Sequence, residues 1–233
     1  MFPLPSHFFD LKDFAHADLF FNKKPVWDTL KNLKLYLEAY TLGQIDCEVP
    51  DGVVLVNPDK ISIGEKTILE PGSFIEGPCI IGSHCHVRHG AYLRSYFIAG
   101  DHCMLGHAVE VKRAVLLDHA SASHFNYIGD SLIGNRVNLG AGVVCANLRL
   151  DRKEVMIRLG DQVLKSGLKK LGAIVGDGSQ LGCNSVINPG VLLKKRTLSK
   201  ACVSWETSNW NASAGGNFVT CKVVKEKIHH GEH

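Results

Sequence analysis

The sequence predicts an all-β fold, a three-sided parallel β-helix preceded by a small helical segment. Three observations support this prediction. An aliphatic residue recurs at every sixth position over much of the chain, and a small or β-branched residue follows it four positions later. The same period is missing from residues 1–45, where apolar side chains recur at helical spacing instead. A fixed short period is typical of a solenoid, in which each coil packs on its neighbours.

The period of six is clearest between residues 63 and 123. Nine of the eleven positions in this series are Ile, Leu or Val. The series is Ile63, Leu69, Ile75, Ile81, Val87, Leu93, Ala99, Leu105, Val111, Leu117 and Ser123. Six residues of extended chain make a wall of roughly 20 Å, and three such walls close a coil of about 18 residues. Stacked coils would bury aliphatic on aliphatic, which no single coil can do alone.

The phase of the repeat changes after Ser123. The aliphatic positions resume at Ile133, ten residues later, and continue to Leu193. The pattern therefore predicts two breaks in the wall, at residues 121–130 and 147–172. The second is polar and partly alternating, which favours a projecting loop or β-ribbon. Segments that leave a rigid scaffold often carry binding residues, so both breaks are candidate site walls.

Residues 1–45 are predicted to form a helical N-terminal cap. Its apolar residues at helical spacing are Trp27, Leu30, Leu33, Leu37 and Tyr40. Because a solenoid must cover its open end, we expect this helix to lie there. The β-helix is predicted over residues 46–200, with the inserted loop 147–172. The tail 201–233 has no clear period.

Charge and composition exclude several classes of function. The chain has 26 basic and 23 acidic residues, a net charge of +3, which is too small for a nucleic-acid-binding face. No apolar run approaches the roughly 20 residues that a membrane span needs. The N-terminus lacks the pattern of a secretory signal, so we expect a cytoplasmic protein. Its eight cysteines form no CxxC pair, which favours reduced thiols.

The hexads, such as IGEKTI and LGAGVV, resemble those of the hexapeptide-repeat acyltransferases. That resemblance implies a left-handed parallel β-helix, a homotrimer and acetyl-CoA as co-substrate. A sharper resemblance runs through VRHGAYL, EVKRAVL, SHFNYIGD, ANLR and KLGAIVGDG. These strings are similar to the C-terminal acetyltransferase half of bifunctional sugar-1-phosphate nucleotidylyltransferases, including glucosamine-1-phosphate N-acetyltransferase. The resemblance implies N-acetylation of an amino-sugar 1-phosphate in UDP-N-acetylglucosamine synthesis.

The resemblance does not extend to the nucleotidylyltransferase half. That half begins with a Gly-rich loop carrying a basic residue, and nothing in residues 1–60 is similar to it. We therefore do not expect pyrophosphorylase activity from this chain.

The resemblance assigns catalytic roles to His124 and Asn147. N-acetylation requires a base that takes a proton from the attacking amine, and an imidazole accepts protons near neutral pH. His124 occupies the position of the family's catalytic histidine; the alternative is a histidine of a surface loop. Asn147 corresponds to an asparagine that lies beside the amine or acetyl group in relatives.

Substrate-binding roles are implied for five residues: Arg88, Lys112, Tyr127, Asn138 and Lys170. The three basic side chains would bind the sugar phosphate, for which positive charge is required. Simple solvation is the alternative for these cations. Tyr127 and Asn138 correspond to sugar-contacting residues, but Tyr127 also falls at a core position of the repeat, so it could be partly structural.

Three further residues are expected to contact acetyl-CoA. Ala141 corresponds to a backbone contact at the thioester, and Cys183 replaces a serine of the relatives. Lys194 could meet the CoA phosphates, or it could be a solvated edge. Two histidine pairs, 84 with 102 and 89 with 107, are each separated by one full coil and should stack. We expect no metal site, because no carboxylate or cysteine completes a ligand set.

Two other functions remain open at this point. The chain could be a catalytically inactive β-helix that binds a partner or a nucleotide sugar. It could also be an acyltransferase with a different acceptor, such as galactosamine phosphate or an amino acid.

Overall fold

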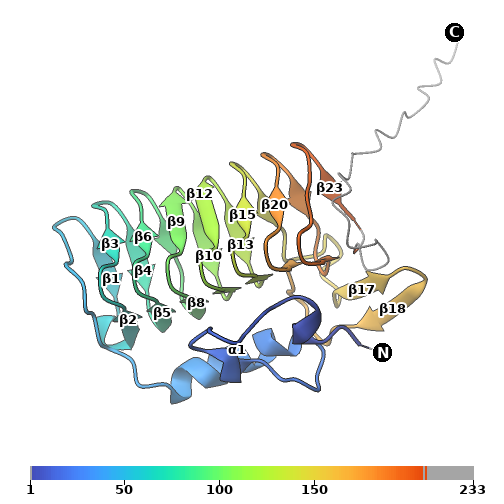
Figure 1. Cartoon of the computed structure of the whole chain (residues 1–233), viewed down its shortest axis with the longest axis horizontal. Coiled ribbons are helices and arrows are strands. Elements are labelled where there is room, and N and C mark those ends of the chain that lie inside the picture. The colour runs from blue at the N-terminus through green and yellow to red at the C-terminus, as the bar shows by residue number, and fades with distance from the viewer. Residues whose placement is uncertain (1, 207, 209–233) are drawn as a thin grey trace, which may run out of the picture.

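A computed structural model describes residues 2–206 and 208 of the chain and shows a three-sided parallel β-helix (Figure 1). The walls of the helix are three parallel sheets, named A, B and C here. Sheet A contains β2 (Ile61–Ile63), β5 (Cys79–Ile81), β8 (Phe97–Ala99), β11 (Val115–Leu116), β14 (Leu132–Ile133), β19 (Ile174–Val175) and β22 (Leu192–Leu193). Sheet B contains β1 (Val54–Val56), β4 (Phe74–Glu76), β7 (Tyr92–Leu93), β10 (Glu110–Lys112), β13 (Tyr127–Gly129), β16 (Val144–Cys145), β21 (Val186–Ile187) and β23 (Ser204–Trp205). Sheet C contains β3 (Ile68–Leu69), β6 (His86–Val87), β9 (Met104–His107), β12 (Ser121–His124), β15 (Asn138–Leu139) and β20 (Gln180–Leu181).

The predicted hexad side chains fill the interior of the solenoid. In sheet B, for example, Ile75 pairs in register with Leu93, which in turn pairs with Val111, and all three are fully buried. Small residues such as Cys85 and Cys103 occupy the second inward slot of each hexad and are also buried. The predicted stack of aliphatic on aliphatic is therefore confirmed for the coils up to Val111.

The structure corrects the prediction at the next two positions. Leu117 and Ser123 do not point into the solenoid; Leu116 and Ala122 take their places in the core. The reason is a corner between sheets B and A that is one residue shorter, so the step from Val111 to Leu116 is five. The phase therefore changes before the predicted break at 121–130.

A second short corner follows β13. The step from Ile128 to Ile133 is again five residues, and Ile128 is the inward residue of this strand. Tyr127, which the repeat places in the core, therefore lies on the outer face of sheet B and is half-buried. The predicted core position of Tyr127 was wrong, because the corner at Asp130 is also one residue shorter than the repeat assumes.

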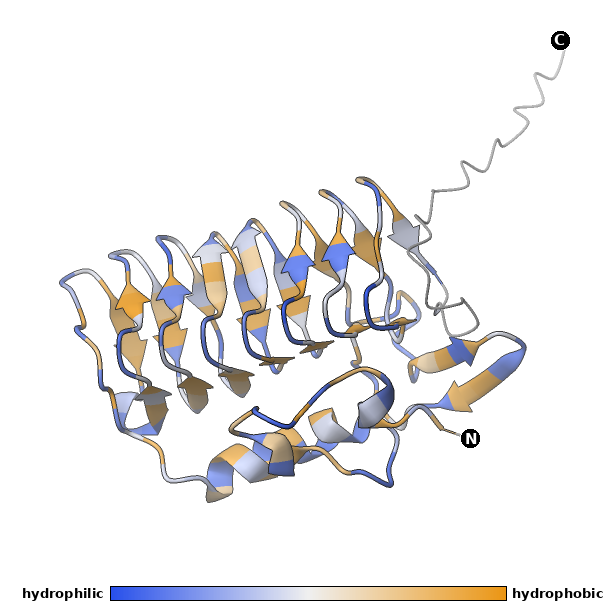
Figure 2. Ribbon diagram, in the orientation of Figure 1, coloured by the Kyte–Doolittle hydropathy of each residue, from blue (hydrophilic) through white to orange (hydrophobic). Residues whose placement is uncertain are grey.

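The N-terminal segment is helical, as predicted, but it does not cover the open end. It contains η1 (Pro5–His7), η2 (Ala17–Leu19) and α1 (Asp28–Ala39), and Figure 1 shows α1 lying along the length of sheet A. Most sheet A strands are orange along their whole length in Figure 2, so apolar residues follow one another in them. The outward side chains of this sheet share a second core with the N-terminal segment: Ile80, Ile98, Val115, Leu132, Ile174 and Leu192. Strands buried on both sides are typically continuous hydrophobic runs.

The inserted segment 147–172 forms the predicted β-ribbon. β17 (Met156–Leu159) and β18 (Gln162–Lys165) pair antiparallel, and a bridge between Leu148 and Lys170 closes the base of the insertion. Buried Val155 and Ile157 pack in the same core as α1. The ribbon is therefore anchored on the N-terminal segment.

The solenoid extends past residue 200, so the predicted boundary there is too early. β23 adds a strand to sheet B, and Trp205 is only 4% exposed at this end of the core. η3 (Pro58–Lys60) lies in the first coil. Within the predicted tail, residues 207 and 209–233, including Cys221, fall outside the described residues.

Two further features concern helix apolarity and the cysteines. No helix in the described part of the chain has the length and apolarity to cross a bilayer. The described cysteines are free thiols: 47, 79, 85, 103, 145, 183 and 202.

Candidate active site

The predicted site residues lie mainly along the two borders of the outer face of sheet B. We call the corner between sheets C and B the C/B edge, and the corner between sheets B and A the B/A edge. His124 ends β12 at the C/B edge, whereas Lys112 ends β10 at the B/A edge. Each border carries its own group of predicted residues.

The backbone around His124 is tightly held, while its side chain is exposed. Its N–H donates to Oδ1 of Asn126 at 3.2 Å, and its carbonyl accepts from the N–H of Gly142 at 3.0 Å. Asn126 is 2% exposed and donates to the carbonyl of Gly140 in the next coil at 2.8 Å. Within residues 2–206 and 208, no group hydrogen-bonds the imidazole of His124, so it is open to a ligand.

Two predicted cofactor residues share the C/B edge with His124. Because Ala122 pairs with Leu139 and Leu139 with Leu181, Ala141 and Cys183 follow His124 in successive coils. Successive coils are about 4.8 Å apart, the spacing of neighbouring strands. The three residues thus line one edge, along which an extended ligand could run.

The predicted histidine stacks are also confirmed. The rings of His89 and His107 are nearly parallel with centroids 5.7 Å apart, and those of His84 and His102 are 4.7 Å apart. His107 pairs in register with His124, so the first stack precedes the candidate base on the C/B edge. No group of three or more metal-ligating side chains is found among the described residues.

Arg88 lies on the C/B edge as well, two coils before His124. Its Nε is 3.9 Å from Oε1 of Glu70, which also lies 2.7 Å from Nε2 of His86. The pKa of Glu70 is lowered, first by a hydrogen bond from the N–H of His89. The Arg88 side chain is about one-third exposed and can therefore turn toward an anionic ligand.

A second group of residues lies on the outer face of sheet B and at the B/A edge. We define the sheet B cluster as Arg94, Glu110, Lys112, Arg113, Tyr127, Asp130, Asn147 and Lys170. The pKa of Lys112 is lowered by burial and then by repulsion from Lys170 and Arg94, against the attraction of Asp130. Converging positive charges at a half-buried position favour an anion there.

Two predicted polar side chains meet over Gly129. A Cβ at this glycine would come within 2.6 Å of both Nδ2 of Asn147 and the hydroxyl of Tyr127. Burial raises the pKa of Tyr127, with further contributions from Glu110 and Asp130. The missing side chain at Gly129 is therefore what lets these two groups approach each other.

Some predicted residues are not brought together within one chain. Arg88 and Lys112, which were expected to bind one phosphate, lie at opposite borders of sheet B. Lys194 follows β22 at the corner between sheets A and C, one wall away from the corner that carries Ala141. Asn138 is exposed on the outer face of sheet C, in register with Ser121.

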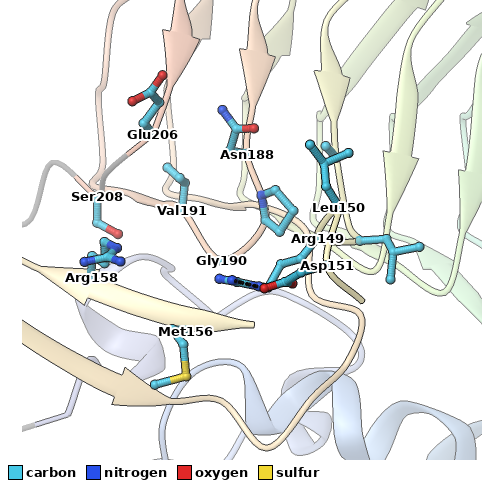
Figure 3. Close-up of a pocket in the computed structure, with 13 residues that line it drawn as sticks. Arg149, Leu150, Asp151, Met156, Arg158, Asn188, Gly190, Val191, Glu206 and Ser208 are labelled. Atoms are coloured by element: carbon cyan, nitrogen blue, oxygen red, sulfur yellow. Dashed lines mark hydrogen bonds and ion pairs between the residues drawn. The ribbon is translucent and has the colours of Figure 1, made fainter. Parts of the chain in front are cut away.

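A pocket of about 620 Å³ opens beside the sheet B cluster (Figure 3). It lies between the inserted segment and the last coils, with Arg158 and Met156 on one side and Asn188 on the other. Arg149 and Asp151 form a two-bonded ion pair at its wall. None of the predicted site residues lines this pocket, although Asn147 lies between two residues that do.

The family of the chain follows from comparison with known proteins. Residues 75–201 match the family described as the GMPPB C-terminal domain, and this match takes in more than half of the 233 residues. The chain belongs to this family. The matched range contains His124, Ala141 and Cys183 of the C/B edge and every residue of the sheet B cluster.

Several curated relatives support the resemblance that the motifs predicted. The Sulfurisphaera tokodaii "Bifunctional sugar-1-phosphate nucleotidylyltransferase/acetyltransferase" is 44% identical over 84 residues, which cover 36% of this chain and 21% of that protein. The "Bifunctional protein GlmU" of Methanococcus maripaludis strain C7 is 38% identical over 89 residues, 38% of this chain and 21% of that protein. These matches span about a fifth of the relatives' own length. The Escherichia coli K12 "Putative uncharacterized acetyltransferase YaiX" is 31% identical over 168 residues, 72% of this chain and 73% of that protein.

Sequence reasoning missed several members of the sheet B cluster. Arg94 lies one coil before Lys112, and Glu110 lies one coil before Tyr127, so each pair shares a column of sheet B. Arg94 and Glu110 form an ion pair at 2.9 Å. Arg94 is 18 residues, or one full coil, before Lys112. The repeat alone could therefore have placed it next to that lysine.

Proposed function

We propose that this protein is an acetyltransferase that transfers the acetyl group of acetyl-CoA to the amine of an amino-sugar 1-phosphate. Glucosamine 1-phosphate is the proposed acceptor, in UDP-N-acetylglucosamine synthesis. The observation that carries the proposal is an exposed imidazole at one border of sheet B with a cationic cluster at the other. Membership of the GMPPB C-terminal domain family and relatives named as acetyltransferases support it.

In the proposed reaction the sugar amine attacks the thioester carbonyl carbon. A C–N bond forms, the C–S bond breaks and CoA leaves as the thiolate. His124 takes the proton released by the amine and returns it to the thiolate sulfur. The C/B edge, where Ala141 and Cys183 follow His124, is the proposed track for acetyl-CoA.

The sheet B cluster is the proposed binding site for the acceptor. Lys112 and Lys170 would bind the phosphate, and their mutual repulsion in the unliganded protein would be relieved by its charge. Tyr127 and Asn147 would contact the sugar beside Gly129.

The complete site is proposed to form between subunits of a homotrimer. A cyclic interface joins two different faces, so it can bring the C/B edge of one chain beside sheet B of the next. Exposed apolar side chains on these walls favour such contacts, among them Tyr92 at 43%, Ile68 at 57% and Phe125 at 60%. We place the protein in the cytoplasm, where free thiols persist.

Release of CoA with a panel of acceptors tests the proposal. The full chain and acetyl-CoA are incubated with glucosamine 1-phosphate, galactosamine 1-phosphate, glucosamine and glucose 1-phosphate, and the free thiol is titrated with DTNB. We expect turnover with an amino-sugar phosphate and none with glucose 1-phosphate. A folded protein that turns over none of them, and whose melting temperature is unchanged by acetyl-CoA, would instead be the non-catalytic β-helix.

A further inference from the structure

The sheet B cluster contains a buried carboxylate to which the proposed reaction gives no role. Asp130 is 1% exposed at the corner after β13. One of its oxygens lies 2.6 Å from Nε of Arg113, an ion pair without an aligned hydrogen bond. The other oxygen accepts a hydrogen bond from Nδ2 of Asn147. An ionised carboxylate is costly to bury unless it is paired, so these two contacts hold it in place.

The carboxylate determines which way the amide of Asn147 faces. A carboxylate can only accept hydrogen bonds, so Asn147 must turn its NH₂ group toward Asp130. The same nitrogen lies beside the hydroxyl of Tyr127 over Gly129. Asn147 also lowers the pKa of that phenol, against the larger effect of burial. Because the NH₂ group is held by Asp130, the carbonyl oxygen Oδ1 lies on the other side of the planar amide.

That oxygen is available to a ligand. Of the residues in 2–206 and 208, none donates a hydrogen bond to Oδ1 of Asn147, and this residue is partly exposed. A ligand whose phosphate is held by Lys112 would meet the acceptor oxygen of the Asn147 amide here and not its NH₂ donor. In the reverse orientation, Oδ1 would face the Asp130 carboxylate and the NH₂ group would repel an ammonium.

We propose that Asp130 is a positioning residue that fixes the amide of Asn147 with its carbonyl oxygen toward the acceptor, so that the site selects an amine. The inference depends on the proposed function for the identity of the acceptor. Asp130 acts through Asn147 and contacts no reacting atom itself.

The test measures binding rather than turnover. Isothermal titration at pH 7 compares glucosamine 1-phosphate, whose ammonium can only donate, with glucose 1-phosphate, whose hydroxyl can donate or accept. We expect the wild-type chain to bind the amine about tenfold more tightly, since hydrogen bonds to charged groups are the stronger kind. Asp130→Asn should bring the two affinities within about twofold, because an amide at position 130 lets Asn147 face either way. Asn also tolerates the left-handed backbone at this residue, φ 47°.

An exchange variant separates orientation from packing. In Asp130→Asn/Asn147→Asp, the new amide donates to one oxygen of the new carboxylate, whose other oxygen faces the ligand. This variant should regain the preference for the amine. A purely structural role for Asp130 would instead weaken both ligands equally in the single variant.

A second variant covers the case in which Asp130→Asn does not fold. Gly129→Ala adds a methyl group that displaces Asn147 and Tyr127 but leaves the Asp130–Arg113 pair intact. It should also lose the preference.

Two results overturn the inference. One is a wild-type chain that does not prefer glucosamine 1-phosphate, which includes a chain that binds neither sugar phosphate. The other is a set of variants that keep the wild-type preference for glucosamine 1-phosphate. A wild-type chain that prefers the amine yet releases no CoA overturns the proposed function alone.

Discussion

At the scale of single residues, the chemistry of the site depends on charges that the fold holds close together. Lys112 is half-buried beside Lys170 and Arg94, which is why its pKa is lowered. A bound phosphate would supply the missing negative charge and raise that pKa again. The affinity for phosphate is therefore linked to the protonation of Lys112.

This linkage predicts a pH dependence with a definite sign. Affinity for glucose 1-phosphate should be full below the pKa of Lys112 in the free protein and fall as the pH rises through it. Because that pKa is lowered, the fall should begin at a lower pH than an ordinary lysine, near 10.5, would give. Titration calorimetry between pH 7 and 10 measures it.

Lys112→Arg is the matched control for this prediction. A guanidinium keeps its charge over the whole range, so this variant should bind with little change up to pH 10. A variant that shows the wild-type pH profile would rule out Lys112 as the group responsible.

At the scale of elements, the N-terminal segment is a structural part of the solenoid wall. Leu33 of α1 is fully buried against sheet A, whereas Leu35, two residues later, is 65% exposed. Outward residues of sheet A, such as Ile98 and Leu132, are completely buried by this segment. Loss of the helix would expose a whole apolar wall.

Leu33→Ala should lower the free energy of unfolding by about 2 to 5 kcal/mol, through lost burial and the cavity left behind. Leu35→Ala makes the same chemical change on the exposed face and should cost no more than about 0.5 kcal/mol. Urea unfolding of both variants measures the difference. Equal losses would show that α1 does not pack as described.

The sequence predicted the coils well because an inward side chain every six residues follows directly from strand geometry. The sequence could not locate the short corners. Residues 114–117 are all apolar, so hydrophobicity does not show which of them points into the solenoid. The covered wall was only partly visible. Most sheet A strands carry two adjacent aliphatic residues, as in Ile80 and Ile81, but β1, β3 and β21 of the other sheets do so too.

The predicted site was harder to assemble from the sequence. The period correctly places Ala141 in the coil after His124. Lys112 follows Arg88 by 24 residues, which is one coil of 18 plus one wall of six. The repeat therefore places the two residues at different corners. Motif resemblance assigned both to one phosphate because it carries no information on which chain of an assembly supplies each residue. The pocket at Arg158 depends on how the insertion folds back, which no repeat encodes.

At the scale of the whole molecule, two of the three walls are left open. Sheet A is covered by the N-terminal segment, while sheets B and C carry the exposed apolar residues and the candidate site. We therefore expect a homotrimer of the 25.5 kDa chain in solution. Sedimentation equilibrium at assay concentrations measures this, and a stable monomer with full activity would contradict an active site shared between subunits.

The central claim is that His124 removes the proton of the acceptor amine. The most direct test is the rate of CoA release with glucosamine 1-phosphate for the wild type and for His124→Asn, whose amide cannot serve as a base. His84→Asn is the control, since His84 is exposed at the corner between sheets A and C and its left-handed backbone suits Asn. The account predicts a loss of roughly 100-fold or more in kcat for His124→Asn and a near wild-type rate for His84→Asn. A His124→Asn chain that turns over at the wild-type rate would contradict it.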